Sequence, residues 1–252
     1  MPKRALPREE TSQEAINEEN VDETEKIIVS ELKAHKQGQF VPKTSLGREV
    51  VEGRITSLYQ IFEEGRKITE PEIVDMLLPN LSSEIIMIGG STGKGGGIKR
   101  TAVKRTTRMH KSGRRYRISV MTAVGDKSGF LGIGFAKGPV QLHKEVANRS
   151  LRDAKLNIFP VKLGCGSWEC MCGGKHSIPF NTRGKAGSVR IELKPAPNGV
   201  GIVASDEIKK ILRLAGIRDI WCKSRGQTQT RINFVYALVD ALKNINKARA
   251  PT

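Results

Sequence analysis

The sequence predicts an α+β fold organised in two domains. Its length of 252 residues exceeds one typical domain and falls short of three. Between residues 67 and 245, segments that alternate apolar and polar side chains, as strands do, are interspersed with segments of helical periodicity. The chain also carries 43 Lys and Arg against 26 Asp and Glu, a formal net charge of +17. Such a surplus of positive charge indicates a polyanionic partner, and nucleic acid is the first candidate.

Two features bear on where the protein works. No run of about 18 apolar residues is present, and the start MPKRALPREE lacks the apolar stretch of a signal peptide, so we expect a cytoplasmic protein that has no membrane partner. Three of the four cysteines fall within eight positions. This clustering is more typical of a metal site in a reducing compartment than of a secreted disulfide framework.

The first part of the chain predicts no domain of its own. Residues 1–31 hold nine carboxylates against four Lys or Arg, and we expect an acidic, mobile extension over residues 1–38. Residues 39–66 give short helical signals that Pro42 and three glycines interrupt. This pattern favours a strap that lies over a surface.

Residues 67–157 predict a first domain. PEIVDMLLP, opened by Pro71, is a short helix, and the glycine-rich loop GGSTGKGGGIKR follows it. TAVKRTTRMHKSGRRYRISVMTAVGD alternates as two antiparallel strands that turn near Ser112-Gly113, and FLGIGFAKG is a third strand. The helix at residues 139–157 has an apolar stripe with Val140, His143, Val146, Ala147, Leu151 and Ala154 on it or beside it. The order helix, three strands, helix matches the architecture of a double-stranded-RNA-binding fold.

Residues 158–252 predict a second α+β domain. After a cysteine-rich loop we expect strands at residues 177–180, 187–194, 200–204 and 218–223. DEIKKILRLAG is a helix that Ser205 can cap and Gly216 ends. The final helix, residues 229–245, has a core face made of Ile232, Val235, Leu238, Val239 and Leu242.

An uninterrupted cationic tract is the strongest functional signal. From Ile85 through Gly125 there is no Asp or Glu. The same stretch supplies ten positive charges, Lys94, Lys99, Arg100, Lys104, Arg105, Arg108, Lys111, Arg114, Arg115 and Arg117. Unopposed cations repel one another, and a fold tolerates this more easily when phosphates supply the counter-charge.

Within the tract, RMHKSGRRYR has the composition of a hairpin tip that contacts RNA. Lys and Arg can meet phosphates, glycine allows close approach of the backbone, and Tyr116 can stack or pack. We expect His110, Ser112 and Gly113 to share in the contact. The alternative is an ordinary solvated hairpin, which would mix charges of both signs.

Two glycine motifs are weaker signals. GIGFAKG resembles a phosphate-cradling turn, but its spacing is not that of a dinucleotide-binding fingerprint. GGSTGKG lacks both the spacing and the Ser or Thr of a phosphate-loop NTPase. We interpret both as loops that approach an RNA backbone, through Gly132, Gly134 and Lys137 in the first. For Gly132 and Gly134 the alternative is a strand packed closely on a helix.

The polar loop KSRGQTQTR, which leads into the last helix, offers a further RNA contact. Its side chains Lys223, Arg225, Gln227 and Arg231 can reach phosphates. The alternative is that Thr228 only caps the last helix and leaves an exposed first turn.

Cys165, Cys170, Cys172 and His176 form the pattern C-x4-C-x-C-x3-H. Three thiolates and an imidazole can hold a tetrahedral zinc ion, which would staple a loop of little apolar content. The spacing differs from that of standard zinc fingers. The alternative is that Cys165 and Cys170 pack while His176 contacts RNA, and Cys222 is most simply a strand residue.

No catalytic constellation emerges from the sequence. The four histidines lack an arrangement with Ser, Cys or paired carboxylates that would single out a reaction. We therefore expect a binding protein that is not an enzyme and requires no cofactor beyond a possible structural zinc. The remaining rival is a free RNA chaperone.

Four segments together resemble a known family, small-subunit ribosomal protein five. They are RMHKSGRRYR, VGDKSGFLGIGFAKG, LKPAPNGVGIVASDEIKKILRLAGIRDIW and INFVYALVDAL. PKTSLGREVVEGRIT and EPEIVDMLLP extend the resemblance toward the N-terminus, and with GCGSWECMCGG they resemble its archaeal branch. The resemblance implies a double-stranded-RNA-binding-like domain followed by a second domain of the S-five domain-two-like α+β fold.

The resemblance also implies a function. It implies a structural constituent of the small ribosomal subunit that binds ribosomal RNA near the decoding region and the messenger entry channel, and supports subunit assembly and translational accuracy. Small-subunit proteins four and eight would be neighbours, with messenger RNA nearby. Carried onto this sequence, the hairpin loop is His110–Arg115 and the RNA-facing glycine loop is Gly132–Lys137. The bacterial hairpin loop has a double glycine where this chain has Ser112-Gly113.

Overall fold

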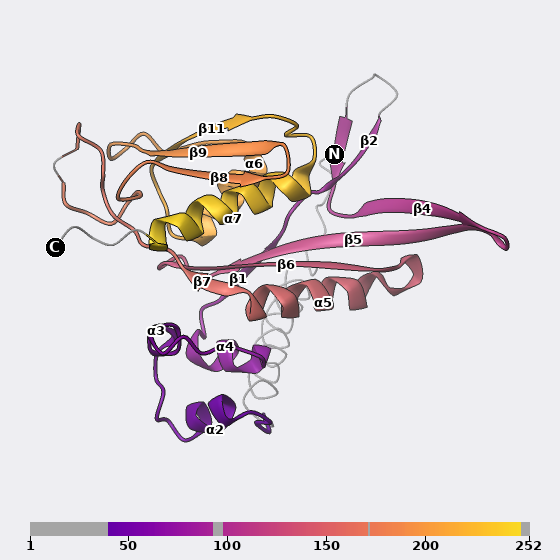
Figure 1. The fold of residues 1–252 in the computed structure, drawn as a ribbon, viewed down its shortest axis with the longest axis horizontal. Helices are drawn as coiled ribbons and strands as arrows, with labels where there is room; N and C mark the ends of the chain where they lie inside the picture. The colour runs from indigo at the N-terminus through magenta and orange to yellow at the C-terminus, as the bar shows by residue number, and fades with distance from the viewer. Residues whose placement is uncertain (1–39, 93–97, 171, 248–252) are drawn as a thin grey trace, which may run out of the picture. The chain divides into compact units, whose positions relative to one another are not determined.

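The fold was analysed in a computed structural model, which describes residues 40–92, 98–170 and 172–247 (Figure 1). By internal compactness the chain divides into two units, residues 1–45 and residues 46–252. The acidic extension expected over residues 1–38 lies outside the described residues, and so does Lys94. The description below concerns the second unit.

A five-stranded antiparallel sheet forms the first half of this unit. Its main path has the order β1, β5, β6, β7. Strand β4 pairs with the same edge of β5 as β1 does, but with the N-terminal part of β5, whereas β1 pairs with its C-terminal end. The strands are β1 (Ser82–Ile85), β4 (Lys104–His110), β5 (Gly113–Gly125), β6 (Phe130–Pro139) and β7 (Ile158–Pro160). The three predicted strands are present, whereas the short edge strands β1 and β7 lack a recognisable pattern of their own.

Helices and a small hairpin complete this half. The helices are α4 (Pro71–Leu77) and α5 (His143–Leu156), the latter preceded by the short 3-10 helix Val140–Leu142. The small hairpin consists of β2 (Gly89–Thr92) and β3 (Ile98–Thr101), in a segment expected to be only a flexible loop. On α5, Val146 and Ala154 are buried as predicted, but His143 is exposed because it lies in the first turn, beyond the apolar stripe.

Helix α5 packs very closely on β6, and glycines make this possible. A Cβ atom on Gly132 would come within 2.2 Å of the carbonyl oxygen of Ala154, and one on Gly134 within 2.1 Å of that of Ser150. The Ser150 hydroxyl donates a hydrogen bond of 3.1 Å to the carbonyl oxygen of Gly134. Both glycines are buried. Close packing of the strand on the helix, the alternative considered for Gly132 and Gly134, therefore explains these glycines better than the predicted RNA contact does.

A four-stranded sheet forms the second half, in the order β10, β11, β9, β8. β10 is parallel to β11, and the other neighbours are antiparallel. The elements are β8 (Thr182–Ala186), β9 (Val189–Pro195), β10 (Ile202–Val203), α6 (Asp206–Leu214), β11 (Ile220–Arg225) and α7 (Arg231–Lys247). α7 covers one face of this sheet, where Gly184 lets the strand approach the backbone of Ala237 and Ala241.

Two expectations for the second half need correction. Residues 177–180 do not form a strand, since Ser177 makes only an isolated bridge with Gly164 and Pro179 has no N–H to extend a ladder. The strand that lies in this region is β8. Ser205 does stand at the N-cap of α6 with extended backbone, but its side chain makes no capping hydrogen bond.

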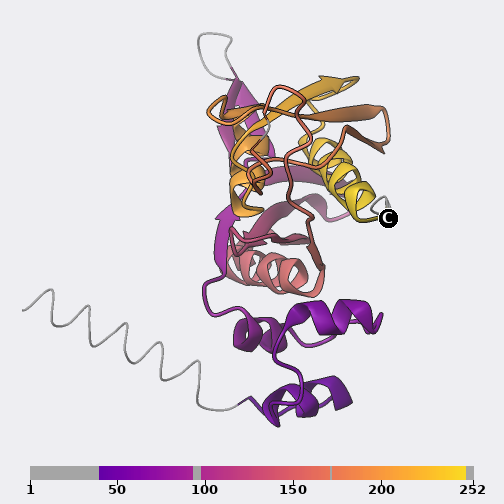
Figure 2. The ribbon, with the colours of Figure 1, turned by 90° about the vertical axis from the view of Figure 1, so that its left-hand side faces the viewer.

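One large apolar core joins the two halves. Met121 and Ala123 of β5 belong to the same buried cluster as Leu212 and Leu214 of α6 and Leu238 of α7. Successive residues of a strand face opposite sides of a sheet. The first sheet therefore lies between α5 on one face and α6 with α7 on the other, as Figure 2 shows.

Residues 45–66 form two short helices, α2 (Ser45–Val51) and α3 (Leu58–Glu63). Leu58 and Ile61 of α3 are almost fully buried. The rings of Tyr59 and Phe130 have centroids 4.6 Å apart, so α3 packs on Phe130, the first residue of β6. This segment is thus joined to the sheet by an aromatic contact.

The packing of α5 on β6 predicts that adding a methyl group to a glycine of β6 destabilises the fold by an amount that depends on what the methyl group meets. Gly134→Ala should lower the free energy of unfolding by about 1–3 kcal/mol, because its methyl group meets helix backbone that cannot move aside alone. Gly138→Ala should cost less, since its Cβ meets chiefly a methyl group of Val146. Urea unfolding of both variants tests this, and equal stability of Gly134→Ala and the unsubstituted chain would contradict it.

Candidate functional site

The first candidate site is the basic hairpin, residues 104–117, formed by β4 and the first part of β5. Every residue from Lys104 through Arg117 is exposed. β6 pairs with β5 only from Arg117 onward, so the tip of the hairpin projects past the third strand (Figure 1). Among the ion pairs of the described residues, none involves a side chain of this hairpin.

The register distributes the cations over both faces of the hairpin. Arg108 stands opposite Arg115, and Lys104 opposite Ser119, which pairs on its other side with Lys137. Side chains directly opposite each other in adjacent strands share a face. One face therefore carries Lys104, Arg108, His110, Arg115, Arg117 and Lys137. Like charges directly opposite one another are destabilising, and here nothing of opposite sign lies between them.

The other face combines cations with an aromatic ring. It presents Arg105, Arg114 and Tyr116, and the guanidinium carbon of Arg105 lies 3.9 Å from the centroid of the Tyr116 ring. At the turn, Arg115 donates a hydrogen bond of 2.9 Å to the hydroxyl of Ser112, and Gly113 has a φ of 100° that favours glycine. Lys111, next to this turn, is exposed. The sequence-predicted residues of the hairpin are thus all exposed, on its two faces and at its turn.

The polar segment 223–231 divides between a strand and a turn. Lys223 and Arg225 are exposed on β11, not in a loop, and Gln227 lies in the turn that follows. α7 begins at Arg231, directly after Thr230, so Thr228 lies in the turn rather than at the helix cap.

The fold brings two predicted cations from distant segments together. The pKa of Arg231 is lowered by burial first and by the positive charge of Arg100 second. Arg100 lies on β3, whose hairpin also includes Lys99 in its backbone. The start of α7 is therefore electrostatically linked to the N-terminal part of the cationic tract.

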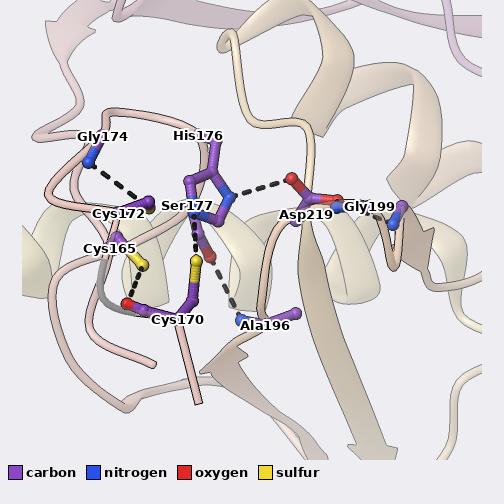
Figure 3. A network of polar contacts seen from close by, with 10 residues as sticks. Cys165, Cys170, Cys172, Gly174, His176, Ser177, Ala196, Gly199 and Asp219 are labelled. Carbon is purple, nitrogen blue, oxygen red and sulfur yellow. Dashed lines mark hydrogen bonds and ion pairs between the residues drawn. The ribbon is translucent and has the colours of Figure 1, made fainter. Parts of the chain in front are cut away.

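A second candidate site is the cluster of Cys165, Cys170, Cys172 and His176, shown in Figure 3. Their ligand atoms, three sulfurs and an imidazole nitrogen, all lie within 4.8 Å of one another. Ligand atoms around a tetrahedral zinc ion are roughly 3.3–3.8 Å apart, given Zn–S and Zn–N bonds of about 2.3 and 2.0 Å. The cysteine spacing is unusual, but the loop brings the four ligand atoms close enough together to surround one metal ion.

His176 is held in the orientation that a metal ligand needs. Its Nδ1 lies 2.9 Å from a carboxylate oxygen of Asp219, and its Nε2 lies 3.8 Å from the sulfur of Cys170 (Figure 3). Both His176 and Asp219 are buried. A carboxylate on the outer nitrogen fixes the tautomer that leaves the inner nitrogen free for the metal. The sequence could not single out Asp219, because it stands far from the cysteine loop along the chain.

Asp219 also organises the turn before β10. Its second carboxylate oxygen accepts hydrogen bonds from the backbone N–H groups of Gly199, at 3.1 Å, and Gly201, at 2.8 Å. The carbonyl oxygen of His176 accepts in turn from the N–H groups of Arg218 and Asp219. The cysteine loop, the glycine turn and the start of β11 are therefore joined through one buried side chain.

The cysteines differ in their tendency to ionise. The pKa of Cys170 is lowered to about 6, first by a hydrogen bond with the backbone of Asn198 and next by one with Cys172. Burial raises the pKa of Cys222 to about 11. Thiolates are the form that binds metal, so Cys222 is chemically as well as spatially set apart from the cluster.

Comparison with known proteins identifies the chain. Residues 99–162 match the family model described as ribosomal protein S5, N-terminal domain, and residues 184–250 match ribosomal protein S5, C-terminal domain. The chain belongs to the ribosomal protein S5 family. Both matches occur in the order that the resemblance of the sequence motifs implied, so the expected family is confirmed.

Archaeal relatives match over most of the chain. Each is named small ribosomal subunit protein uS5. The protein from Nanoarchaeum equitans is 49% identical over 213 residues, which cover 84% of this chain and 90% of the relative. The protein from Staphylothermus marinus is 47% identical, covering 84% and 91%. That from Methanothermobacter thermautotrophicus is 46% identical, covering 84% and 90%. The expected archaeal type is thereby confirmed.

Family membership decides several expectations. Proteins of this family are structural and non-enzymatic components of the small ribosomal subunit, which act in translation in the cytoplasm, so these expectations are confirmed. Within the described residues, no helix combines the length and apolar character that crossing a membrane requires.

The network around Asp219 predicts a large loss of stability when its carboxylate is removed. Asp219→Ala leaves two backbone N–H groups and the His176 ring without their acceptor, which should cost about 3 kcal/mol or more of unfolding free energy. Asp219→Asn retains an acceptor oxygen and should cost less. Thermal unfolding of the two variants in one buffer measures the difference. A fully stable Asp219→Ala protein would show that the network has little weight.

Proposed function

We propose that this chain is a structural constituent of the small ribosomal subunit that binds ribosomal RNA through the basic hairpin. The observation that carries the proposal is the exposed, register-aligned array of cations on residues 104–117, which has no carboxylate within it. Phosphate contacts account for much of the affinity of RNA-binding proteins. The hairpin holds its cations in fixed positions, where RNA phosphates neutralise them.

Both faces of the hairpin contribute to this binding. The face of Lys104, Arg108 and Arg115 neutralises phosphates, with Lys137 beside it on β6. On the opposite face, Tyr116 and the stacked Arg105 offer flat surfaces to an unstacked base or a ribose. Such a two-faced element fits an RNA junction, where backbones approach from more than one side.

The first domain, residues 67–157, acts as a double-stranded-RNA-binding-like module, and residues 158–252 as an S-five domain-two-like module. The order α4, β4, β5, β6, α5 supports this interpretation. Residues 39–66 serve as a strap attached through Tyr59, and residues 1–38 as an acidic extension.

Within the subunit, we place the chain near the decoding region and the messenger entry channel. Its neighbours there are small-subunit proteins four and eight, with messenger RNA nearby, and its RNA contacts support subunit assembly and translational accuracy. A rigid element that fixes an RNA junction restricts the conformations open to that junction, which is the physical basis of both effects.

The cysteine cluster binds one structural zinc ion. The donor set of three sulfurs and the Nε2 of His176 fits zinc, and the carboxylate of Asp219 on the other ring nitrogen matches the usual outer partner of a zinc-bound histidine. A structural site of four protein ligands stabilises a loop rather than catalysing a reaction. Zinc would hold the cysteine loop against β11 where few apolar side chains are available.

Removing two arginines at the hairpin tip should weaken RNA binding and make it less dependent on salt. For Arg114→Ala plus Arg115→Ala, we expect the slope of log affinity against log salt to fall by about one to two, because each phosphate contact releases about one counterion. Binding of the full chain to small-subunit ribosomal RNA transcribed in vitro measures the slope.

The matched control for the hairpin removes two exposed lysines elsewhere, Lys67→Ala plus Lys162→Ala. It subtracts the same charge without touching the hairpin. In cells, sedimentation should show less of the hairpin variant than of the control in small subunits. An unchanged salt slope in the hairpin variant would remove the hairpin from the RNA interface.

Metal analysis tests the zinc proposal. The purified chain should contain one zinc ion per molecule, and Cys170→Ser should lose most of it because the site then has only three ligands. Cys222→Ser is the matched control and should keep its zinc, since Cys222 lies outside the cluster. Absence of zinc from the unsubstituted chain purified without chelator would sink the proposal.

A further inference from the structure

The face of the second sheet that α7 does not cover carries a second array of cations. Alternation along β8, β9 and β11 places the core residues Gly184, Val189 and Ile191 on the α7 side. The opposite side, here called the outer sheet face, presents Arg183, Lys185, Arg190, Lys194, Lys223 and Arg225. All six are exposed. Of these six cations, the sequence alone singles out only Lys223 and Arg225.

The register sets like charges directly beside one another. Lys185 pairs with Arg190, which pairs on its other side with Arg225, so three cations form a row across three strands. Neighbouring strands are about 4.8 Å apart, and like charges directly opposite each other destabilise a sheet. Such a row is unfavourable for the isolated chain, and an external anion relieves it.

One carboxylate on this face is already engaged. Glu192 lies between Arg183 and Lys223 in the next row, and it accepts a hydrogen bond of 3.1 Å from Arg183. The pKa of Glu192 is lowered, first by that hydrogen bond and further by the positive charges of Arg183, Lys194 and Arg225. Among the side chains that β8, β9 and β11 present on this face, one carboxylate stands against six cations, so the face is strongly positive.

The face also has an exposed aromatic side chain. Trp221 of β11 is 37% exposed, and it lies between Lys194 of β9 and Val203 of β10 in the register. An aromatic ring beside cations is the combination on which RNA-binding sheets stack bases while they neutralise the backbone. An acidic protein would be attracted by the cations, but it has no bases to stack on the ring, so the ring favours RNA as the partner.

We propose that the outer sheet face is a second RNA-binding surface, which takes phosphates of an RNA strand on its six cations and a base or ribose on Trp221. The proposal rests on the proposed function of the chain as an RNA-binding ribosomal constituent. It assigns RNA contact to the second domain independently of the basic hairpin. The chain then holds RNA on two separate sheets that one apolar core keeps in fixed relation.

The test removes the like-charge row in the full chain, with Lys185→Ala, Arg190→Ala and Arg225→Ala combined. Affinity for in vitro transcribed small-subunit ribosomal RNA should fall by at least roughly tenfold, and the salt slope by about two to three. Stability should stay the same or rise, because mutual repulsion is relieved. That combination separates lost binding from lost folding. The matched control, Lys67→Ala, Lys162→Ala and Lys247→Ala, removes equal charge from exposed positions elsewhere.

Tryptophan fluorescence provides an independent readout, because the chain has only two tryptophans. In Trp168→Phe, where Trp221 is the sole reporter, the same RNA should shift or quench the emission. In Trp221→Phe, where Trp168 remains, the change should be much smaller. Both variants keep every cation of the two proposed surfaces.

Two results would overturn the proposal. One is a row variant that loses no more affinity than its lysine control, together with unmoved Trp221 emission. The other is a row variant that binds RNA normally but loses binding to a synthetic acidic peptide of residues 1–31, which would make the face a protein-binding surface. Either result leaves the hairpin intact as an RNA interface, because Arg114 and Arg115 are tested in their own variant.

Discussion

Mutual repulsion among exposed cations is the constraint on which the rest of this structure depends. Residues 104–117 hold Arg108 opposite Arg115 with no carboxylate in the hairpin to separate them. A protein folded for its own stability alone would alternate charges at such positions. The arrangement is sensible when a phosphate-rich surface supplies the missing charge, as RNA does in the ribosome.

The scaffold beneath the hairpin is what keeps this charge in place. β5 continues without interruption from the exposed tip into the core, where α5 packs on one face of the sheet and α6 on the other. Gly132 and Gly134 bring α5 against the strand backbone, and Ser150 ties the helix to β6. A cation array at the end of such a strand loses little conformational entropy on binding, because the backbone is already ordered.

Local patterns predicted the long elements and the hairpin, but not what depends on tertiary packing. The alternation through Ser112-Gly113 located β4 and β5, since their turn chemistry and pattern agree. The strands β1, β7 and β8 were not predicted, because they are too short to show alternation and are defined by pairing with neighbouring strands. The glycines of β6 invited a phosphate-binding interpretation, whereas a close helix explains them. Asp219 could not be connected to His176, because only the fold brings the two residues together.

The most direct measurement is a map of protein–RNA crosslinks in small subunits that contain this chain. The account predicts crosslinked peptides over residues 104–117, with Tyr116 among the modified side chains, and none at the buried glycines of β6. Crosslinks confined to other parts of the chain, with the hairpin unmodified and accessible to solvent probes in the assembled subunit, would contradict it.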